Sequence, residues 1–349
     1  MAVIDDNLPE RIETENELEL LLSRPSRALV EFIKTLESPL LILGAGGKMG
    51  PILALLARNA AEAAGHPLKI IAASRFSDEQ LPARLNRHGI ETRRCDLLER
   101  GGIESLPVAP NILYLVGLKF GTTENPSATW AVNTIVPTRV AERFSNSRIV
   151  ALSTGNVYPL SDPNNGGAVE TDPLTPVGEY ANAAVARERV FEFHSRAQQI
   201  PIALLRLFYA VELRYGVLVD IARKVHSGEA IDLGNGYFNC IWQGDANEMV
   251  IRALSLATAP PSAWNLCRPE IFSVRQAANA FGEFLGRTPA FRDQESRTAL
   301  LGNSNPLCAR LGTPSVSLEK MLRWISHWVK RGGRDLGKPT HFEARDGRY

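Results

Sequence analysis

The residues best suited to chemistry form a glycine-rich turn directly after the short apolar run LLIL, and this turn reads GAGGKMG. Glycines three residues apart allow a tight bend, let the backbone approach a pyrophosphate closely, and open a helix whose N-terminus attracts negative charge. A glycine trio alone is a weak signal, but between the first strand and first helix of an alternating pattern it is a strong one. We therefore expect this turn to bind a dinucleotide cofactor through Gly44, Gly46, Gly47, Lys48, Met49 and Gly50.

The ends of the next two strands indicate which dinucleotide is bound. The second strand ends in Ser74-Arg75, and no Asp or Glu follows until Asp78. An acidic residue at this place would bind the ribose 2′-hydroxyl of NAD, whereas an arginine can meet the 2′-phosphate of NADP. Arg75 therefore favours NADP, with NAD as the other option, unless it is simply an exposed surface arginine. Asp96-Leu97, after the third strand, is placed to contact the adenine, although an Asp that caps the following helix would look the same.

These residues need a scaffold, and the chain from Leu40 onward alternates buried strands with amphipathic helices. Strands are expected at LLIL, LKIIAA, IETRRC, NILYLVG, RIVALS and IPIALLRLF, and the long helices between them at about 49–64, 127–144 and 177–198. Such alternation predicts a parallel sheet that is covered on both faces. The expected fold class is α/β: a Rossmann-type doubly wound parallel sheet with a smaller C-terminal α/β substrate lobe.

Changes in pattern divide the chain into four parts. Residues 1–38 are an N-terminal extension with one helix, roughly Glu15 to Leu36, which ends at Ser38-Pro39. Residues 39–210 form the dinucleotide-binding domain, to which part of 232–268 returns. The lobe takes 211–231 and 269–332, and 333–349 is a polar tail of no readable conformation. Beyond residue 208, helices are expected at about 215–228, 245–257, 273–286 and 317–330.

Bulk properties argue against several classes of function. The formal net charge of +1 gives no reason to expect a nucleic-acid or anionic-membrane partner. The opening is acidic and polar, unlike a signal peptide, and no apolar run is long enough to cross a bilayer, so the expected location is cytoplasmic. The four cysteines and six histidines form no CxxC, HxH or HExxH pattern, so neither a disulfide framework nor a metal site is expected.

An ordered series of later segments resembles the extended short-chain dehydrogenase/reductase family, which includes nucleotide-sugar epimerases and dehydratases. The segment ALSTGNVYP is close to that family's SSxxVYG, and Tyr180 stands where the family has the tyrosine of YxxxK. Asn133 in WAVNTIVPTRV resembles the family's helix asparagine. Arg206 in LLRLFYAV resembles RxxNVYGP, Asp245 in IWQGDANEMV resembles VDDVA, and WNL resembles YNIG. The resemblance covers about residues 40–330.

The resemblance implies an oxidoreductase-type reaction at a hydroxyl-bearing carbon. Tyr180 would take or return the proton of a substrate hydroxyl while hydride moves to or from the nicotinamide. Thr154 would hold the substrate oxygen, Ser153 would lie beside it at the strand end, and Asn133 would belong to the same set. Members of the family often dimerise through the helices expected here at 127–144 and 177–198, so a homodimer is expected.

One departure from the family pattern is plain, because Ala184 stands where YxxxK has its lysine. A nearby cation stabilises a phenolate, whereas an unperturbed tyrosine has a pKa of about 10 and is neutral at pH 7. Lys119, in VGLKFG just past the fourth strand, is the first candidate replacement, and Gly117 beside it is expected to line the cofactor cleft. Arg187, seven residues after Tyr180 and on roughly the same helix face, is the second. The simpler interpretations are a solvated loop lysine and a surface helix arginine.

The substrate is expected to be small. Phe238 stands where nucleotide-sugar members often have a diphosphate-binding arginine, and no Lys or Arg lies between Lys224 and Arg252. This favours a free sugar, a sugar acid or another small polyol or ketone. Phe208, Tyr209, Phe238 and Trp242 are either an apolar wall for a sugar or ordinary core. Two hypotheses follow: an NAD(P)-dependent oxidoreductase or epimerase, or a catalytically degenerate NADP-binding sensor or scaffold.

Overall fold

A seven-stranded parallel sheet forms the centre of the protein, in a computed structural model that describes residues 8–119, 121–122, 124–338 and 340–347. The strand order is β11-β6-β5-β4-β1-β2-β3, so the order reverses between β1 and β4. Its strands are β1 (Leu40–Leu43), β2 (Ile70–Ser74), β3 (Glu91–Arg94), β4 (Asn111–Tyr114), β5 (Arg148–Thr154), β6 (Ile202–Leu207) and β11 (Ser262–Leu266). The predicted fold class, a Rossmann-type doubly wound sheet, is confirmed.

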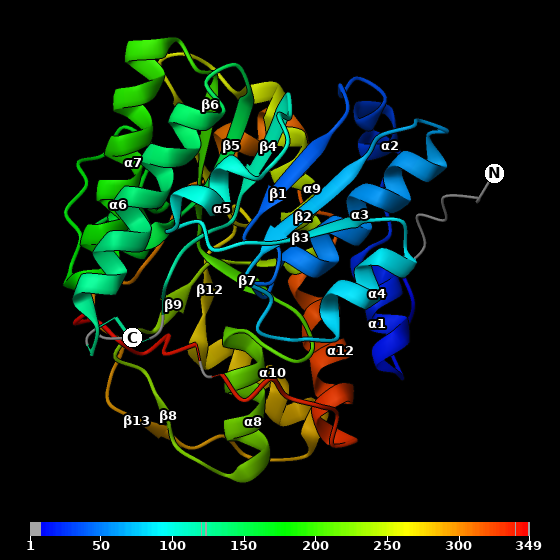
Figure 1. Cartoon of the computed structure of the whole chain (residues 1–349). Coiled ribbons are helices and arrows are strands. Elements are labelled where there is room, and N and C mark those ends of the chain that lie inside the picture. The colour runs from blue at the N-terminus through cyan, green and yellow to red at the C-terminus, as the bar shows by residue number, and fades with distance from the viewer. Residues whose placement is uncertain (1–7, 120, 123, 339, 348–349) are drawn as a thin grey trace.

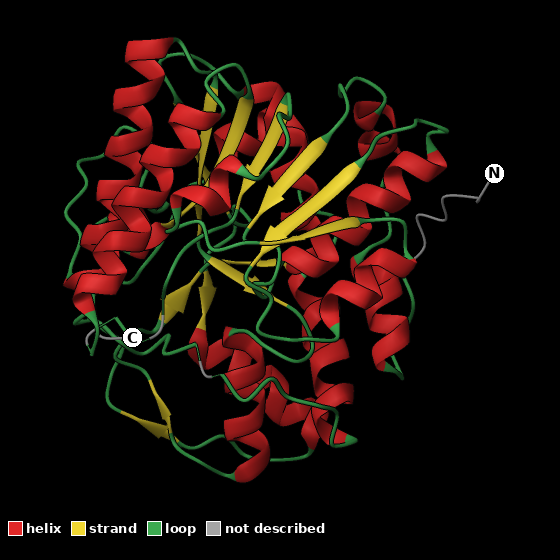
Figure 2. Ribbon diagram, viewed as in Figure 1, coloured by secondary structure: helices red, strands yellow, loops and turns green. Residues whose placement is uncertain are grey.

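Helices cover both faces of the sheet, as Figures 1 and 2 show. One face carries α2 (Arg27–Ile33), α3 (Gly50–Ala63), α4 (Leu81–Arg87) and α9 (Gln243–Arg252). The other carries α5 (Arg100–Glu104), α6 (Pro126–Arg143) and α7 (Gly178–Gln198). Every residue of strands β1 and β4 is buried, because helices cover both faces of the sheet there. This explains their near-continuous apolar sequences.

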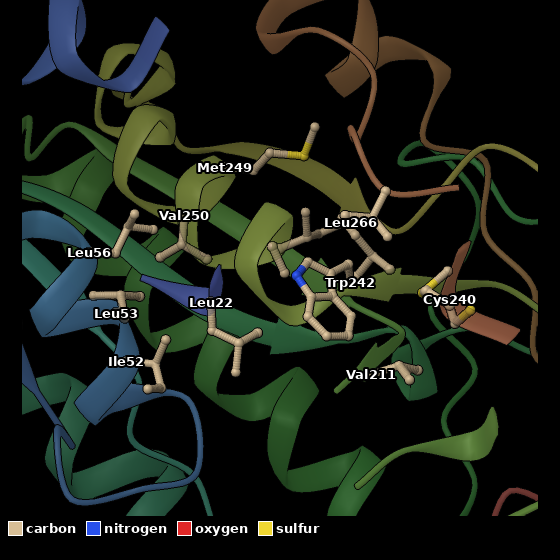
Figure 3. Packing of buried hydrophobic residues seen from close by; sticks show 14 of the residues in the cluster. Leu22, Ile52, Leu53, Leu56, Val211, Cys240, Trp242, Met249, Val250 and Leu266 are labelled. Carbon is tan, nitrogen blue, oxygen red and sulfur yellow. The ribbon is translucent and has the colours of Figure 1, made fainter. Parts of the chain in front are cut away.

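The N-terminal extension differs from the single helix that the sequence predicts. It contains two helices, α1 (Glu15–Leu22) and α2, because the Pro25-Ser26 dipeptide interrupts the chain and the Ser26 hydroxyl caps α2. Leu22 of α1 packs against Ile52 and Leu53 of α3, with Trp242 nearby (Figure 3). The extension therefore completes the core on the α3 side of the sheet.

The smaller lobe follows β6 in the chain. Its helices are α8 (Val217–Ser227), α10 (Val274–Leu285), α11 (Asn305–Leu311) and α12 (Leu318–Lys330). Its short strands pair as β7 (Tyr209–Val211) with β10 (Cys240–Trp242), β9 (Tyr237–Phe238) with β12 (Phe272–Ser273), and β8 (Ile231–Asp232) with β13 (Phe291–Arg292). Helix α11 was not expected from the sequence, and β11 returns to the edge of the main sheet beside β6. None of the described helices combines the length and apolar character that crossing a bilayer requires.

Candidate active site

The glycine turn between β1 and α3 is built so closely that side chains would not fit. Gly44 has φ +82°, and a Cβ there would lie 3.1 Å from the backbone of Val116. A Cβ at Gly50 would lie 2.4 Å from the carbonyl oxygen of Ala45, and one at Gly46 would lie 2.7 Å from Ser74 Oγ. The turn therefore brings bare backbone and the N-terminus of α3 to the point where the strand order reverses, which is where open α/β sheets bind ligands.

A cavity of about 410 Å³ opens beside this turn, at the carboxyl ends of β1, β2, β3 and β4. It is lined by predicted cofactor residues from four separate segments: Gly44, Gly46, Gly47, Ser74, Arg75, Asp96, Leu97 and Gly117. Met49 lies half-buried at the start of α3. The structure thus brings together residues that the sequence expects to bind one dinucleotide.

Two arginines stand at the outer rim of this cavity. Arg75 is 73% exposed and only loosely paired, with Nη1 at 3.9 Å from Asp96 Oδ2. Arg94, which the sequence analysis did not single out, also lines the cavity and binds Glu79 through two hydrogen bonds of 3.0 and 2.7 Å. Asp96 accepts the backbone N–H of Leu98 at 2.9 Å, so it does cap the turn that follows β3. Arg75 is therefore held less tightly by its carboxylate partner than Arg94 is.

Lys48 extends from the glycine turn toward the lobe. Its Nζ lies 3.4 Å from the centre of the Tyr215 ring and donates to the carbonyl of Ala210 at 3.3 Å. Solvent reaches this side chain, yet protein surrounds it on most sides, and this desolvation lowers the pKa of Lys48 to about 7. The charges of Glu212 and Asp220 raise that pKa, while the charge of Lys119 lowers it. Lys48 therefore contacts both the glycine turn and the lobe, and the junction around Lys48, Lys119, Tyr180 and Tyr215 is called the cleft below.

Lys119 and Tyr180 belong to the same cleft. Burial lowers the pKa of Lys119 to about 8, against an opposing effect of Asp220 on α8, and its Nζ donates to the carbonyl of Thr340 at 3.3 Å. Tyr180 is half-buried in the first turn of α7. A charge on Tyr180 would raise the pKa of Tyr215, as burial and Asp220 do, so the two phenols are neighbours. Lys119 is thus not the solvated loop lysine of the simpler interpretation.

Thr154 and Ser153 end β5 and have different surroundings. Thr154 is 7% exposed, and its Oγ1 accepts the N–H of Asn156 at 3.2 Å, so it caps the short turn that follows while its O–H can still donate. Ser153 Oγ donates to Glu188 at 2.5 Å, within a buried network. In that network Arg206 pairs with Glu188 at 2.8 Å and donates to the hydroxyl of Tyr158. Ser153 therefore helps to fix α7 to the sheet.

Asn133 and Arg187 form a second buried bracket, between α6, α7 and β4. Asn133 is 1% exposed, and its Oδ1 accepts from Arg187 Nη1 at 2.9 Å. The same Nη1 donates to the carbonyl of Val116 at 3.0 Å, and a Cβ on Gly117 would lie 2.9 Å from it. With 4% exposure, Arg187 is not a surface arginine, so that interpretation was wrong. No signal in the sequence distinguishes this burial from the exposed face of an amphipathic helix.

Several other residues named from the sequence are structural. Phe238 and Trp242 are core side chains, 0% and 2% exposed, rather than an exposed wall. Asp245 accepts from Ser315 Oγ at 2.6 Å and from the N–H of Val316 at 3.0 Å, which joins α9 to the segment before α12. Ala184 is fully buried among Val157, Phe208 and their neighbours. Among the described residues, no group of three or more His, Cys, Asp or Glu side chains is arranged to hold a metal ion.

Several solved structures share this fold, and three of them are named as enzymes of nucleotide sugars. UDP-glucose 4-epimerase of Thermotoga maritima, solved with UDP-glucose, is 17% identical, with a TM-score of 0.68 over 84% of this chain and 99% of that one. UDP-glucose 4-epimerase of Thermus thermophilus, solved with NAD, is 18% identical, with a TM-score of 0.67 over 83% and 98%. The dTDP-glucose 4,6-dehydratase of Streptomyces venezuelae is 15% identical, with a TM-score of 0.70 over 84% and 97%. Among curated proteins, no sequence matches this chain.

A dinucleotide-binding α/β protein with a cavity beside its glycine turn is the class that this fold and site define. The NAD dependent epimerase/dehydratase family model matches residues 40–267, and the chain belongs to that family. The predicted membership of the extended short-chain dehydrogenase/reductases is confirmed. The cradle fits the cofactor that the family name implies, because the bare backbone of Gly44, Gly46 and Gly47 lines the cavity where α3 begins.

The lowered pKa of Lys48 predicts that cofactor affinity depends on pH. Below about pH 7 the side chain is charged and attracts the pyrophosphate; above it the charge is lost, so NAD⁺ binding should weaken as pH rises. One charge-assisted hydrogen bond corresponds to about tenfold in Kd between about pH 6 and about pH 9. Calorimetric titration at constant salt measures this. Lys48→Ala should bind weakly and with a smaller pH dependence, and a wild-type Kd that is equal at both pH values contradicts the prediction.

Proposed function

We propose that this protein is an NAD(P)-dependent oxidoreductase or epimerase that acts on a secondary hydroxyl or ketone of a small carbohydrate-like molecule. The observation that carries the proposal is the cleft itself. It gathers Tyr180, Tyr215, Lys48 and Lys119 beside a glycine turn shaped for a dinucleotide. A protein that only binds a cofactor has no need of this concentration of proton-transferring groups.

The roles of the chain's own groups follow from their positions. A bound nicotinamide supplies a carbon that accepts or returns hydride. Tyr180 exchanges the proton of the substrate hydroxyl, and Thr154 donates its O–H to the substrate oxygen. Lys119 supplies a cation close to the cofactor cleft, and Arg187 supplies a fixed positive charge beneath Gly117. Among the described residues Arg187 has no carboxylate partner, so its charge is available to stabilise negative charge in the cleft.

The absence of a lysine at position 184 is compatible with this proposal. Ala184 packs into an apolar cluster with Val157, Ala168 and Phe208, and a lysine there would bury its stem and charge in that cluster. The competing proposal, a catalytically degenerate NADP-binding sensor or scaffold, draws its support from the same Ala184. Lys119 and Arg187 favour the enzyme, because both place a positive charge at the carboxyl edge of β4.

Removal of the Tyr180 hydroxyl distinguishes the two proposals. Tyr180→Phe should reduce turnover at least about 100-fold, because a positioned acid or base contributes about 10²–10⁴. Its Kd for NAD(P)⁺ should stay unchanged. The assay follows formation of reduced nicotinamide across a panel of sugars, sugar acids and polyols. Lys119→Ala should abolish turnover or weaken cofactor binding, with Lys69→Ala on the exposed edge as its control. Full activity in Tyr180→Phe, or wild-type behaviour in Lys119→Ala, contradicts the role assigned to that residue.

A preference for NADP over NAD is part of the proposal, and the loosely paired Arg75 supports it. The 2′-phosphate would gain about one charge-assisted hydrogen bond, so Arg75→Ala should weaken NADP⁺ binding about tenfold and leave NAD⁺ binding unchanged. Arg93→Ala is the matched control, because Arg93 is exposed on the neighbouring strand and pairs with Glu91. Calorimetric titration measures the affinity of the wild type and of both variants for each of the two cofactors. A wild-type protein that binds NAD⁺ more tightly than NADP⁺ contradicts this part of the proposal.

We also propose that the substrate carries no nucleotide. Phe238 is buried, and Lys224 is engaged with Glu343. The tail does bring another cation, Arg345, against the lobe at Gly234 and Thr298. The sequence did not predict this position. The Nη1 of Arg345 is bound to the carbonyls of Gly234 and Thr298, at 3.1 and 2.6 Å. The proposal fails if the purified, cofactor-loaded protein turns over UDP-glucose or dTDP-glucose.

A homodimer through α6 and α7 remains a prediction, and exposed apolar side chains on these helices support it. Trp130 and Ile135 on α6 are 39% and 42% exposed, and Phe193 on α7 is 67% exposed. A charge at the centre of such a contact opposes association, so Phe193→Glu should sediment as a monomer. Leu20→Glu, at an equally exposed position on α1, should leave the dimer intact. Sedimentation velocity measures whether each protein is a monomer or a dimer, and a monomeric wild type contradicts the prediction.

A further inference from the structure

The last described residues of the chain, Thr340–Gly347, run along the lobe to the start of α7 and are called the C-terminal strap below. Figure 1 shows this segment in red, running beneath the carboxyl ends of the strands. The strap begins at Thr340, which is 1% exposed. Its N–H and its hydroxyl both donate to Asp220 of α8, at 2.8 and 2.5 Å, and its carbonyl accepts from Lys119. One residue thus joins the lobe to the loop after β4.

The middle of the strap is anchored to the lobe. Phe342 is 1% exposed in the main core, and its carbonyl accepts from Asn235 Nδ2 at 2.6 Å. Glu343 pairs with Lys224, and Arg345 donates to the carbonyl of Gly234. A buried aromatic side chain and several hydrogen bonds hold a segment in place far more firmly than an ordinary exposed tail.

The far end of the strap rests on the start of α7. A Cβ on Gly347 would lie 2.1 Å from the carbonyl oxygen of Val177, and a Cβ on Gly178 would lie 2.3 Å from the carbonyl oxygen of Gly347. The two backbones therefore touch, two residues before Tyr180. The strap contacts the sheet domain at two places, Lys119 and Gly178.

We infer that the C-terminal strap forms a wall of the substrate cleft and limits the size of the molecules that reach Lys119 and Tyr180. Because the strap is fixed at both ends and in the middle, a large ligand cannot displace it without breaking several contacts at once. The strap lies beyond the residues that the family model matches. The inference rests on the proposed function only where it calls the cleft a substrate site.

The test measures access to Lys119 with two lysine reagents of different size, cyanate and trinitrobenzenesulfonate. Near pH 8 a large share of Lys119 is the neutral, reactive amine, so access rather than ionisation controls its rate. Peptide mass spectrometry gives the rate relative to Lys69, whose side chain is 56% exposed. In the wild type, cyanate should react while trinitrobenzenesulfonate is slowed at least about tenfold, equivalent to ~1.4 kcal/mol of local opening. A chain that ends before Thr340 should lose this discrimination. Equal relative rates with the bulky reagent in both proteins would overturn the inference.

A full-length pair of variants guards against a truncated chain that does not fold. Gly347 and Gly332 have φ +73° and +72°, so alanine strains both backbones alike, but only the residue at 347 would collide with another segment. Gly347→Ala should raise trinitrophenylation of Lys119 severalfold, and Gly332→Ala should not. Wild-type labelling in Gly347→Ala, or equal increases in both variants, counts against the wall. None of these measurements involves cofactor binding or turnover. A failure to bind NAD(P)⁺ would therefore refute the proposed function, while the labelling rates would still test whether the strap restricts access to Lys119.

Discussion

The buried ion pair between Glu188 and Arg206 is the interaction on which the arrangement of the site depends. Both side chains are nearly inaccessible, and Ser153, Tyr158 and the carbonyl of Glu170 satisfy their remaining hydrogen-bonding groups. Such a pair adds little net stability over an apolar equivalent, but loss of one partner leaves a buried charge and costs about 3–5 kcal/mol. The pair therefore specifies geometry: α7 is held to β5 and β6 at one rotation. That rotation places Tyr180 at the cleft and turns Arg187 toward β4.

Features encoded within a few residues could be predicted from the sequence. The run LLIL and the turn GAGGKMG fix β1, the bend and the start of α3 by local sterics, so the cavity beside them follows from the pattern alone. The alternation of apolar strands and amphipathic helices gives the sheet. The N-terminal extension shows the limit of this reasoning, because a helical period over Glu15 to Leu36 outweighed the break at Pro25-Ser26, where the serine hydroxyl caps a new helix.

Features that depend on tertiary contacts could not be predicted. Arg187 reads as a surface arginine because its helix is amphipathic and polar, and only the packing of α6, α7 and β4 shows that its charge is enclosed. Arg94 and Glu79 are fifteen residues apart and meet at the cavity rim. The tail GGRDLGKPTHFEARDGRY carries no periodicity, so its course along the lobe could not be inferred. Within the described part of this tail, the large apolar side chain of Phe342 is the one that is buried in the core.

The distribution of charge in the cleft explains how the chain can lack a lysine at position 184. Ala184 faces an apolar cluster that joins β5 to the lobe, so the demand for close packing there opposes a long cationic side chain. Three other side chains supply positive charge near the cleft: Lys48 in the glycine turn, Lys119 in the loop after β4, and Arg187 beneath Gly117. Burial makes the two lysines easier to neutralise, whereas the guanidinium stays charged at every physiological pH. The cleft therefore holds one positive charge that does not titrate, on Arg187, and two on the lysines that weaken as pH rises.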